Sequence, residues 1–71
     1  TTIQFDLTER SVVKLEIFNV LGQRIRTLAE GVFNAGVHRV AFDGQGLSTG
    51  VYYYRLTAPE WVQTRIMAMV K

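Results

Sequence analysis

The chain contains no cysteine and only one histidine, which excludes two common ways of stabilising a very small domain. Disulfides need paired cysteines, and a tetrahedral zinc site needs four side-chain ligands, of which one histidine supplies a single one. A chain near this size buries only about 60% of its unfolded surface, so its margin of stability is thin. Stability must therefore come from apolar packing, and we expect no metal and no cofactor.

Long apolar runs are also missing. The uninterrupted apolar stretches fall far short of the roughly 20 residues that span a bilayer, and no segment resembles a signal peptide. The composition, 48% apolar and 20% charged over 71 residues, predicts one soluble globular domain covering residues 1–71, which does not span a membrane. A net charge of +2 is too small to indicate a particular class of binding partner. Because the chain begins with Thr1 rather than methionine, we expect it to be a piece of a longer product.

Apolar residues recur with period two, which is typical of half-buried strands. Turn signals separate these runs about every 8 to 12 residues, a spacing that indicates an all-β sandwich or small barrel. A seventh strand is possible near residues 31–33, and a helix over residues 22–30 is the alternative, because Leu21, Ile25 and Leu28 fall at helical spacing. The six expected strands cover residues 3–7, 13–17, 24–29, 38–42, 51–56 and 61–70. The expected core consists of Phe5, Leu15, Ile17, Val40, Phe42, Tyr54 and Leu56.

Three tyrosines in a row and a tryptophan suggest a stacking platform for sugars or proline-rich peptides. Period two sends Tyr52 and Tyr54 to one face of the strand and Tyr53 to the other, so the cluster is split. Tyr52 or Tyr54 is expected to tether a neighbouring turn through its hydroxyl, as tyrosines do in sandwiches. Tyr53 and Trp61 remain as possible surface contacts.

Residues 46–50 match the G-x-S-x-G pattern of a hydrolase nucleophile elbow. That elbow needs a strand before its serine, a helix after it and a histidine further along the chain. A strand-like run follows Ser48 instead, and the single histidine, His38, precedes it. His38 and Asp43 would lie about 15 Å apart along an extended strand, too far to act as base and orienter. The six carboxylates are scattered over separate segments, so we predict no catalytic residues and no enzyme activity.

Five arginines alternate with apolar residues and would form a cationic strip if their strands were neighbours. The simpler interpretation is the solvated face of ordinary strands. The aromatic pattern of RNA-binding sheets and the lysine of a phosphate-binding loop are both missing, so we expect no nucleic acid partner. These arginines are Arg24, Arg26, Arg39, Arg55 and Arg65.

Several motifs, taken in order, resemble the C-terminal sorting domain of the type IX secretion system, and the flagellar hook-capping Ig-like domain is similar in the same blocks. The two most specific are N-V-L-G-Q at residues 19–23 and D-G-x-x-L-x-x-G-V-Y-x-Y-R-L at residues 43–56. Others are T-I-x-F-x-L at 2–7, V-x-L-x-I-F at 13–18, G-x-H-x-V-x-F at 36–42, T-x-x-M at 64–67 and the final Lys71. An Asn-Pro-rich lead-in is absent. Phe42 stands where a tryptophan is common, and Ile66 where a basic residue is common.

The resemblance implies an Ig-like antiparallel β-sandwich of six to seven strands, on an exported protein of Bacteroidetes type. Such a domain would be a non-catalytic module that directs a covalently linked upstream passenger to an outer-membrane translocon. The protein would pass through the periplasm and be secreted or attached to the cell surface. On this interpretation Met67, Met69 and Lys71 are the candidate recognition residues. The alternative is a passive Ig-like accessory domain, which packs on a catalytic neighbour or binds carbohydrate weakly through Tyr53 and Trp61.

Overall fold

The computed structural model describes residues 2–42, 44 and 46–69, and these residues form six strands and no helix. Every strand pairing is antiparallel, so the expected all-β sandwich is confirmed. No helix long and apolar enough to cross a membrane occurs in this described part of the chain. In chain order the strands are β1 (Thr2–Leu7), β2 (Ser11–Phe18), β3 (Arg24–Phe33), β4 (Gly36–Ala41), β5 (Gly50–Ala58) and β6 (Trp61–Met69).

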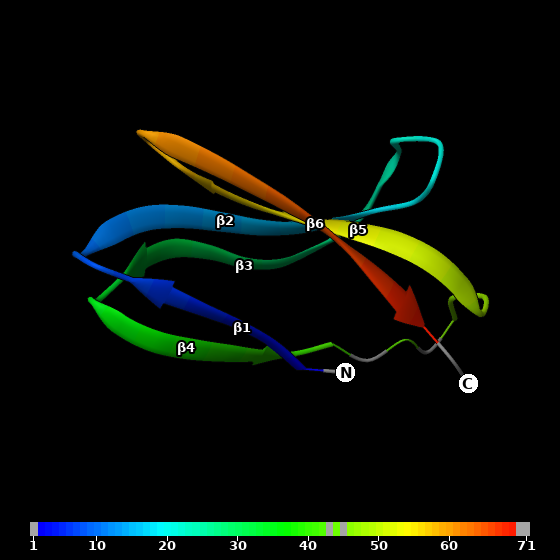
Figure 1. Ribbon diagram of the computed structural model, residues 1–71, viewed down its shortest axis with the longest axis horizontal. Coiled ribbons are helices and arrows are strands. Elements are labelled where there is room, and N and C mark those ends of the chain that lie inside the picture. The colour runs from blue at the N-terminus through cyan, green and yellow to red at the C-terminus, as the bar shows by residue number, and fades with distance from the viewer. Residues whose placement is uncertain (1, 43, 45, 70–71) are drawn as a thin grey trace.

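The strands form two sheets of unequal size. One has four strands in the order β3-β2-β5-β6, and the other consists of β1 and β4 alone. Figure 1 shows the β1–β4 pair lying as a separate layer beneath β2 and β3. Antiparallel partners that stand directly opposite each other point to the same face, so the pairs Leu15–Leu56 and Ile17–Tyr54 define the inward face of the larger sheet.

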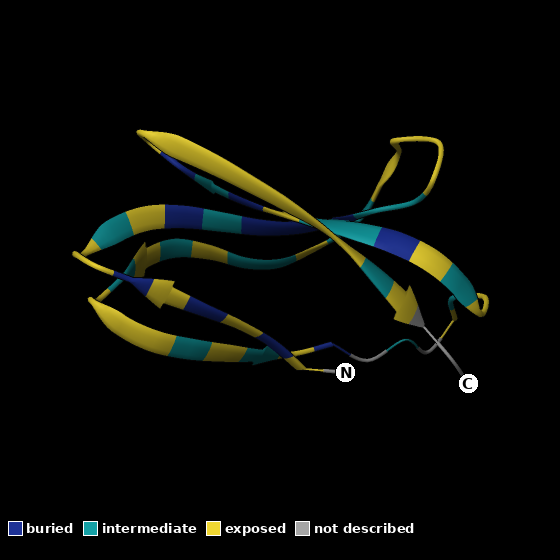
Figure 2. Cartoon of the chain, viewed as in Figure 1, coloured by how far each residue is buried: buried dark blue, intermediate teal, exposed yellow. Residues whose placement is uncertain are grey.

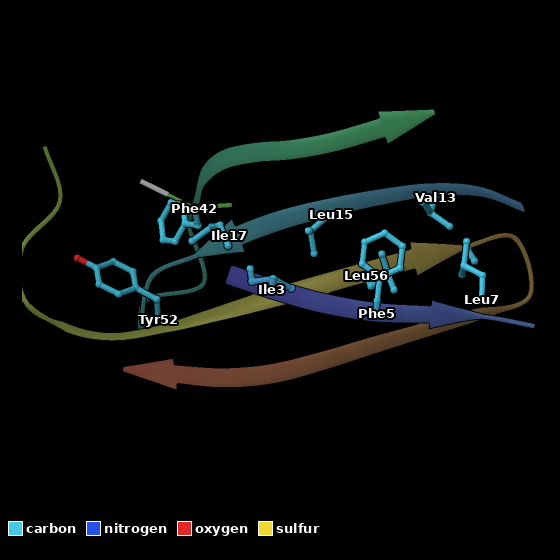
Figure 3. Packing of buried hydrophobic residues seen from close by; sticks show 10 residues of the cluster. Ile3, Phe5, Leu7, Val13, Leu15, Ile17, Phe42, Tyr52 and Leu56 are labelled. Atoms are coloured by element: carbon cyan, nitrogen blue, oxygen red, sulfur yellow. The ribbon is translucent and has the colours of Figure 1, made fainter. Parts of the chain in front are cut away.

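The core lies between the two sheets and follows the period-two pattern. Figure 2 shows buried residues alternating with exposed ones along β1, and the buried residues of β5, Tyr52, Leu56 and Ala58, are an even number of positions apart. Side chains from both layers meet in Figure 3, where Leu15 and Ile17 have no exposed surface. Of the seven expected core residues five are buried, and Val40 and Tyr54 are half-buried against them. The buried set is Ile3, Phe5, Leu7, Val13, Leu15, Ile17, Phe42, Tyr52, Leu56 and Ala58.

The helix considered for residues 22–30 is wrong, because β3 occupies this segment. Its pairing with β2 shifts twice, leaving Leu28 and Ile25 as extra residues without a direct partner on β2. Each extra residue breaks the strict alternation, so inward side chains recur three apart and imitate helical spacing. Both bulged residues are half-buried and pack against the core. The possible seventh strand at residues 31–33 is the end of β3.

Strand β6 extends beyond the smaller sheet. It pairs only with β5 and forms one edge of the four-stranded sheet. Register with β5 places Trp61, Gln63 and Arg65 on the inward face, yet all three are exposed because no strand of the other layer covers them. Met67, further along the same face, is half-buried against the core. One of the longest strands is therefore an open edge.

Candidate functional site

The G-x-S-x-G segment is a loop that leads into β5. Gly46 adopts a φ of +85°, a conformation that glycine tolerates, and the Leu47 amide donates to the Gly44 carbonyl at 2.9 Å. Ser48 is exposed, and its carbonyl oxygen accepts a hydrogen bond from the Tyr52 hydroxyl at 2.7 Å. The elbow of a hydrolase places a helix after its serine, whereas a strand follows here. The loop interpretation of the sequence is confirmed.

His38 has structural contacts on β4. Its Nε2 lies 2.7 Å from the Asn34 carbonyl oxygen, which can only accept, so Nε2 carries the proton. The imidazole stacks on Phe5 with ring centroids 5.3 Å apart, and Phe33 meets it edge-on at 5.1 Å. The expected structural role is therefore confirmed. Asp43, its suggested catalytic partner, lies outside the described residues.

The carboxylates do not converge on a metal site. Within residues 2–42, 44 and 46–69, no three acidic or histidine side chains lie close enough together to hold a metal ion. Glu16 and Glu30 instead form ion pairs with Lys14, at 3.8 and 3.5 Å, and Glu16 also meets Arg24 at 3.4 Å. Glu16 is 8% exposed, so its two cationic neighbours compensate a charge that is otherwise withdrawn from water.

The five arginines do not form one cationic strip. Arg24 and Arg55 lie on the outer face of the four-stranded sheet, opposite Phe18 and Glu16 respectively. Arg65 lies on the inward face of β6, and Arg39 lies on the other sheet, where it donates to Gln4 at 3.1 Å. The fifth, Arg26, stands opposite the inward-facing Ile17, with its guanidinium 5.5 Å from the ring centre of Phe42. The structure thus distributes the charges over several surfaces.

The tyrosines divide as the period predicts. Tyr52 is the turn-tethering residue, because its ring is buried and its hydroxyl reaches the Ser48 carbonyl. Tyr54 faces inward opposite Ile17, and Tyr53 faces outward opposite Phe18.

Trp61 does not join Tyr53, because the two lie on opposite faces of the larger sheet. Its indole is 40% exposed and borders an open groove of about 580 Å³ between the ends of β1 and β6. Asp6, Glu9 and Glu60 also line this groove. A sugar platform shared by Tyr53 and Trp61 is therefore not formed.

Two of the three candidate recognition residues, Met67 and Met69, belong to the end of the edge strand. Met67 stands opposite Tyr52 and is half-buried, so its side chain is partly committed to the core. The backbone of Met69 pairs with Gly50 at the last position of β6. Lys71 lies outside the described residues.

Sequence reasoning missed the outer face of the four-stranded sheet. The register places five exposed aliphatic side chains there, on a surface that no other element covers. The sequence did carry a signal for this face. Where neighbouring residues of a strand are both apolar, both faces of that strand carry apolar side chains. These side chains are Val12, Val32, Val51, Val62 and Ile66.

Comparison with known proteins gives one result. A family model described as the secretion system C-terminal sorting domain matches residues 1–69. No curated protein and no solved structure matches the chain.

Proposed function

The chain belongs to the family of secretion system C-terminal sorting domains, and on this basis we propose that it directs a covalently linked passenger to the outer-membrane translocon of the type IX system. Family membership implies export through the periplasm, followed by secretion or attachment at the cell surface. The match to residues 1–69 is the observation that carries the proposal, because it spans all the described strands.

The exposed edge of β6 supports a recognition role for this strand. An edge strand presents unpaired backbone N–H and C=O groups, to which a strand of another protein can add. Along β6 every described side chain before Met67 is exposed, so a partner strand meets little steric obstruction. We propose that the translocon reads this edge together with Met67, Met69 and Lys71.

A truncation tests the proposal in a host that has the type IX system. A secreted reporter is fused upstream of the whole chain or of a chain lacking residues 67–71, and reporter at the cell surface is measured at equal expression. The deletion removes the backbone pairs of Met67, Ala68 and Met69 with β5, so the end of the edge strand is lost together with the proposed recognition residues. We expect surface delivery to be abolished.

The matched control is Lys71→Ala, which removes a charge without removing a strand position. We expect its free energy of unfolding to stay within about 0.5 kcal/mol of the parent value, because the substitution leaves every backbone pair of β6 with β5 in place. Its delivery should be impaired less than that of the truncated chain. Delivery of the truncated fusion as efficiently as the whole one would overturn the sorting proposal.

A further inference from the structure

The β2–β3 turn is held rigidly by one side chain. The Asn19 Oδ1 accepts from the Leu21 amide at 2.9 Å and from the Gln23 amide at 3.0 Å, while its Nδ2 donates to the Gln23 Oε1 at 2.8 Å. Two backbone bonds of 3.0 Å, Asn19 N–H to Gln23 C=O and Gly22 N–H to Asn19 C=O, close the same turn. Gly22 adopts a φ of +79°, which other residues rarely tolerate. The turn therefore has little freedom to rearrange.

This rigid turn holds two aliphatic side chains in water. Leu21 is 78% exposed and Val20 is 64% exposed. The exposed fraction of Leu21 is the highest among the large hydrophobic residues that the structure describes. Tight turns normally carry polar residues, since exposed apolar surface costs free energy in water. Figure 1 shows the turn curling away from the β1–β4 layer, and Figure 2 shows it almost wholly exposed. The two side chains contribute little to the core and are displayed outward.

The turn adjoins an apolar part of the outer sheet face. Phe18, Tyr53 and Ile66 stand directly opposite one another across β2, β5 and β6. An open hollow of about 120 Å³ lies where the turn meets this row, lined by Phe18, Val20 and Tyr53 among others. Val51 lies two positions before Tyr53 on the same face and is 43% exposed. We call the whole surface the turn patch: Phe18, Val20, Leu21, Val51, Tyr53 and Ile66.

The border of the turn patch is cationic. The Arg55 guanidinium lies 4.5 Å from the centre of the Phe18 ring, and Arg24 stands opposite Phe18 on β3. The nearest carboxylate on this face, Glu16, is buried and already paired with Arg24 and Lys14. Among the described residues Arg55 is exposed and forms no ion pair, so its charge is available to a carboxylate of an approaching surface.

We propose that the turn patch is a docking surface for a protein of the export machinery, whose contact surface is apolar at its centre and carries a carboxylate opposite Arg55. This inference rests on the proposed sorting function and names a second recognition element, remote in sequence from the end of β6. A second copy of the chain is the poorer occupant, because two turn patches would bring both cationic borders into one interface without an unpaired carboxylate of their own. Apolar anchors in a rigid frame bind with little loss of conformational entropy.

The decisive comparison is between two pairs of exposed aliphatic residues. Val20→Ser with Leu21→Ser removes the centre of the turn patch, whereas Val12→Ser with Val32→Ser removes a pair, each 56% exposed, beyond Lys14 on the same face. Each double variant is fused to the reporter described above. We expect the turn variant to lower surface delivery roughly tenfold, as loss of an interface anchor does, and the control to leave it unchanged.

A charge variant tests the cationic border independently. Arg55→Gln removes the charge without placing a second carboxylate opposite Glu16, and Arg39→Gln on the other sheet is its control. We expect Arg55→Gln alone to slow delivery several-fold, because border charges mainly steer association. Thermal unfolding of each purified variant identifies any loss that comes from the fold.

A photo-crosslinker at position 21 keeps the inference testable if a variant is unstable, with position 37 on β4 as the control. A cross-link from position 21 alone to an outer-membrane protein of the type IX system supports the inference. A cross-link only to a second copy, or full delivery of the turn variant while removal of residues 67–71 abolishes delivery, overturns it and leaves the sorting proposal standing. Full delivery of the truncated chain overturns the sorting proposal itself.

Discussion

At the scale of single residues, the inward positions of β2 and β5 determine whether the sandwich closes. Leu15 and Leu56 stand directly opposite each other, with 0% and 3% of their surfaces exposed. Neither side chain has a polar atom, so both contribute through transfer from water and close packing. In a chain of 71 residues each such contact is a large fraction of the whole stability.

Replacing Leu56 with alanine should lower the free energy of unfolding by about 2 to 5 kcal/mol, because the lost side chain leaves a cavity between the sheets. Urea denaturation followed by circular dichroism measures the change. Val62→Ala on the neighbouring strand is the control, since Val62 is 59% exposed and should cost much less. Equal losses for the two variants would contradict the packing described here.

At the scale of elements, the tyrosine hydroxyl on β5 fastens the long connection that precedes it. Tyr52 lies in the core, and its 2.7 Å bond to the Ser48 carbonyl ties this connection to the strand it leads into. Part of the segment that imitates a hydrolase elbow is therefore held by a structural contact. On β3 the two bulges act in a related way, because they turn Ile25 and Leu28 toward the core.

Tyr52→Phe should lower the free energy of unfolding by about 0.5 to 1.5 kcal/mol, the usual net value of one intramolecular hydrogen bond. Tyr53→Phe on the opposite face should change it by less than about 0.5 kcal/mol, because the Tyr53 hydroxyl makes no hydrogen bond to the described residues. Hydrogen exchange of the Leu47 and Ser48 amides should also accelerate in Tyr52→Phe alone. If the two variants behave alike, the tether has no energetic role.

At the scale of the whole molecule, the two-layer arrangement leaves one edge strand and one sheet face uncovered. β6 pairs on one side only, and the smaller sheet packs on the inward face of the larger one. β6 therefore keeps an open edge, and the aliphatic residues of the outer face stay exposed. A free-standing globular protein usually covers or breaks up such surfaces. The open edge and the exposed aliphatic face of this chain agree with a domain that binds other proteins.

We expect the isolated domain to have no hydrolase activity. Ser48 lies in a loop tied by Tyr52, and His38 is engaged by Asn34 and Phe5. The purified chain and Ser48→Ala should therefore show the same background rate with nitrophenyl ester and glycoside substrates. Turnover by the parent chain that disappears in Ser48→Ala would contradict this expectation.

The sequence alone determined the fold class, the strand order along the chain and most of the core. Period-two alternation and glycine-rich turns are local properties, and they predicted the inward positions of β1, β2 and β5 correctly. The division of Tyr52 and Tyr53 between two faces followed from the same period. The motifs at residues 19–23 and 43–56 indicated the family, which the match over residues 1–69 confirmed.

Only the tertiary structure decided how the strands pair and what remains exposed. The bulges of β3 depend on its fit to β2, so the spacing of Ile25 and Leu28 was ambiguous until that pairing was known. The exposed outer face could not be predicted for a similar reason. The sequence does not show whether a second layer covers an apolar residue of a strand. Burial depends on neighbours that are distant in the chain, and here the second layer, β1 with β4, packs on the inward face of the larger sheet.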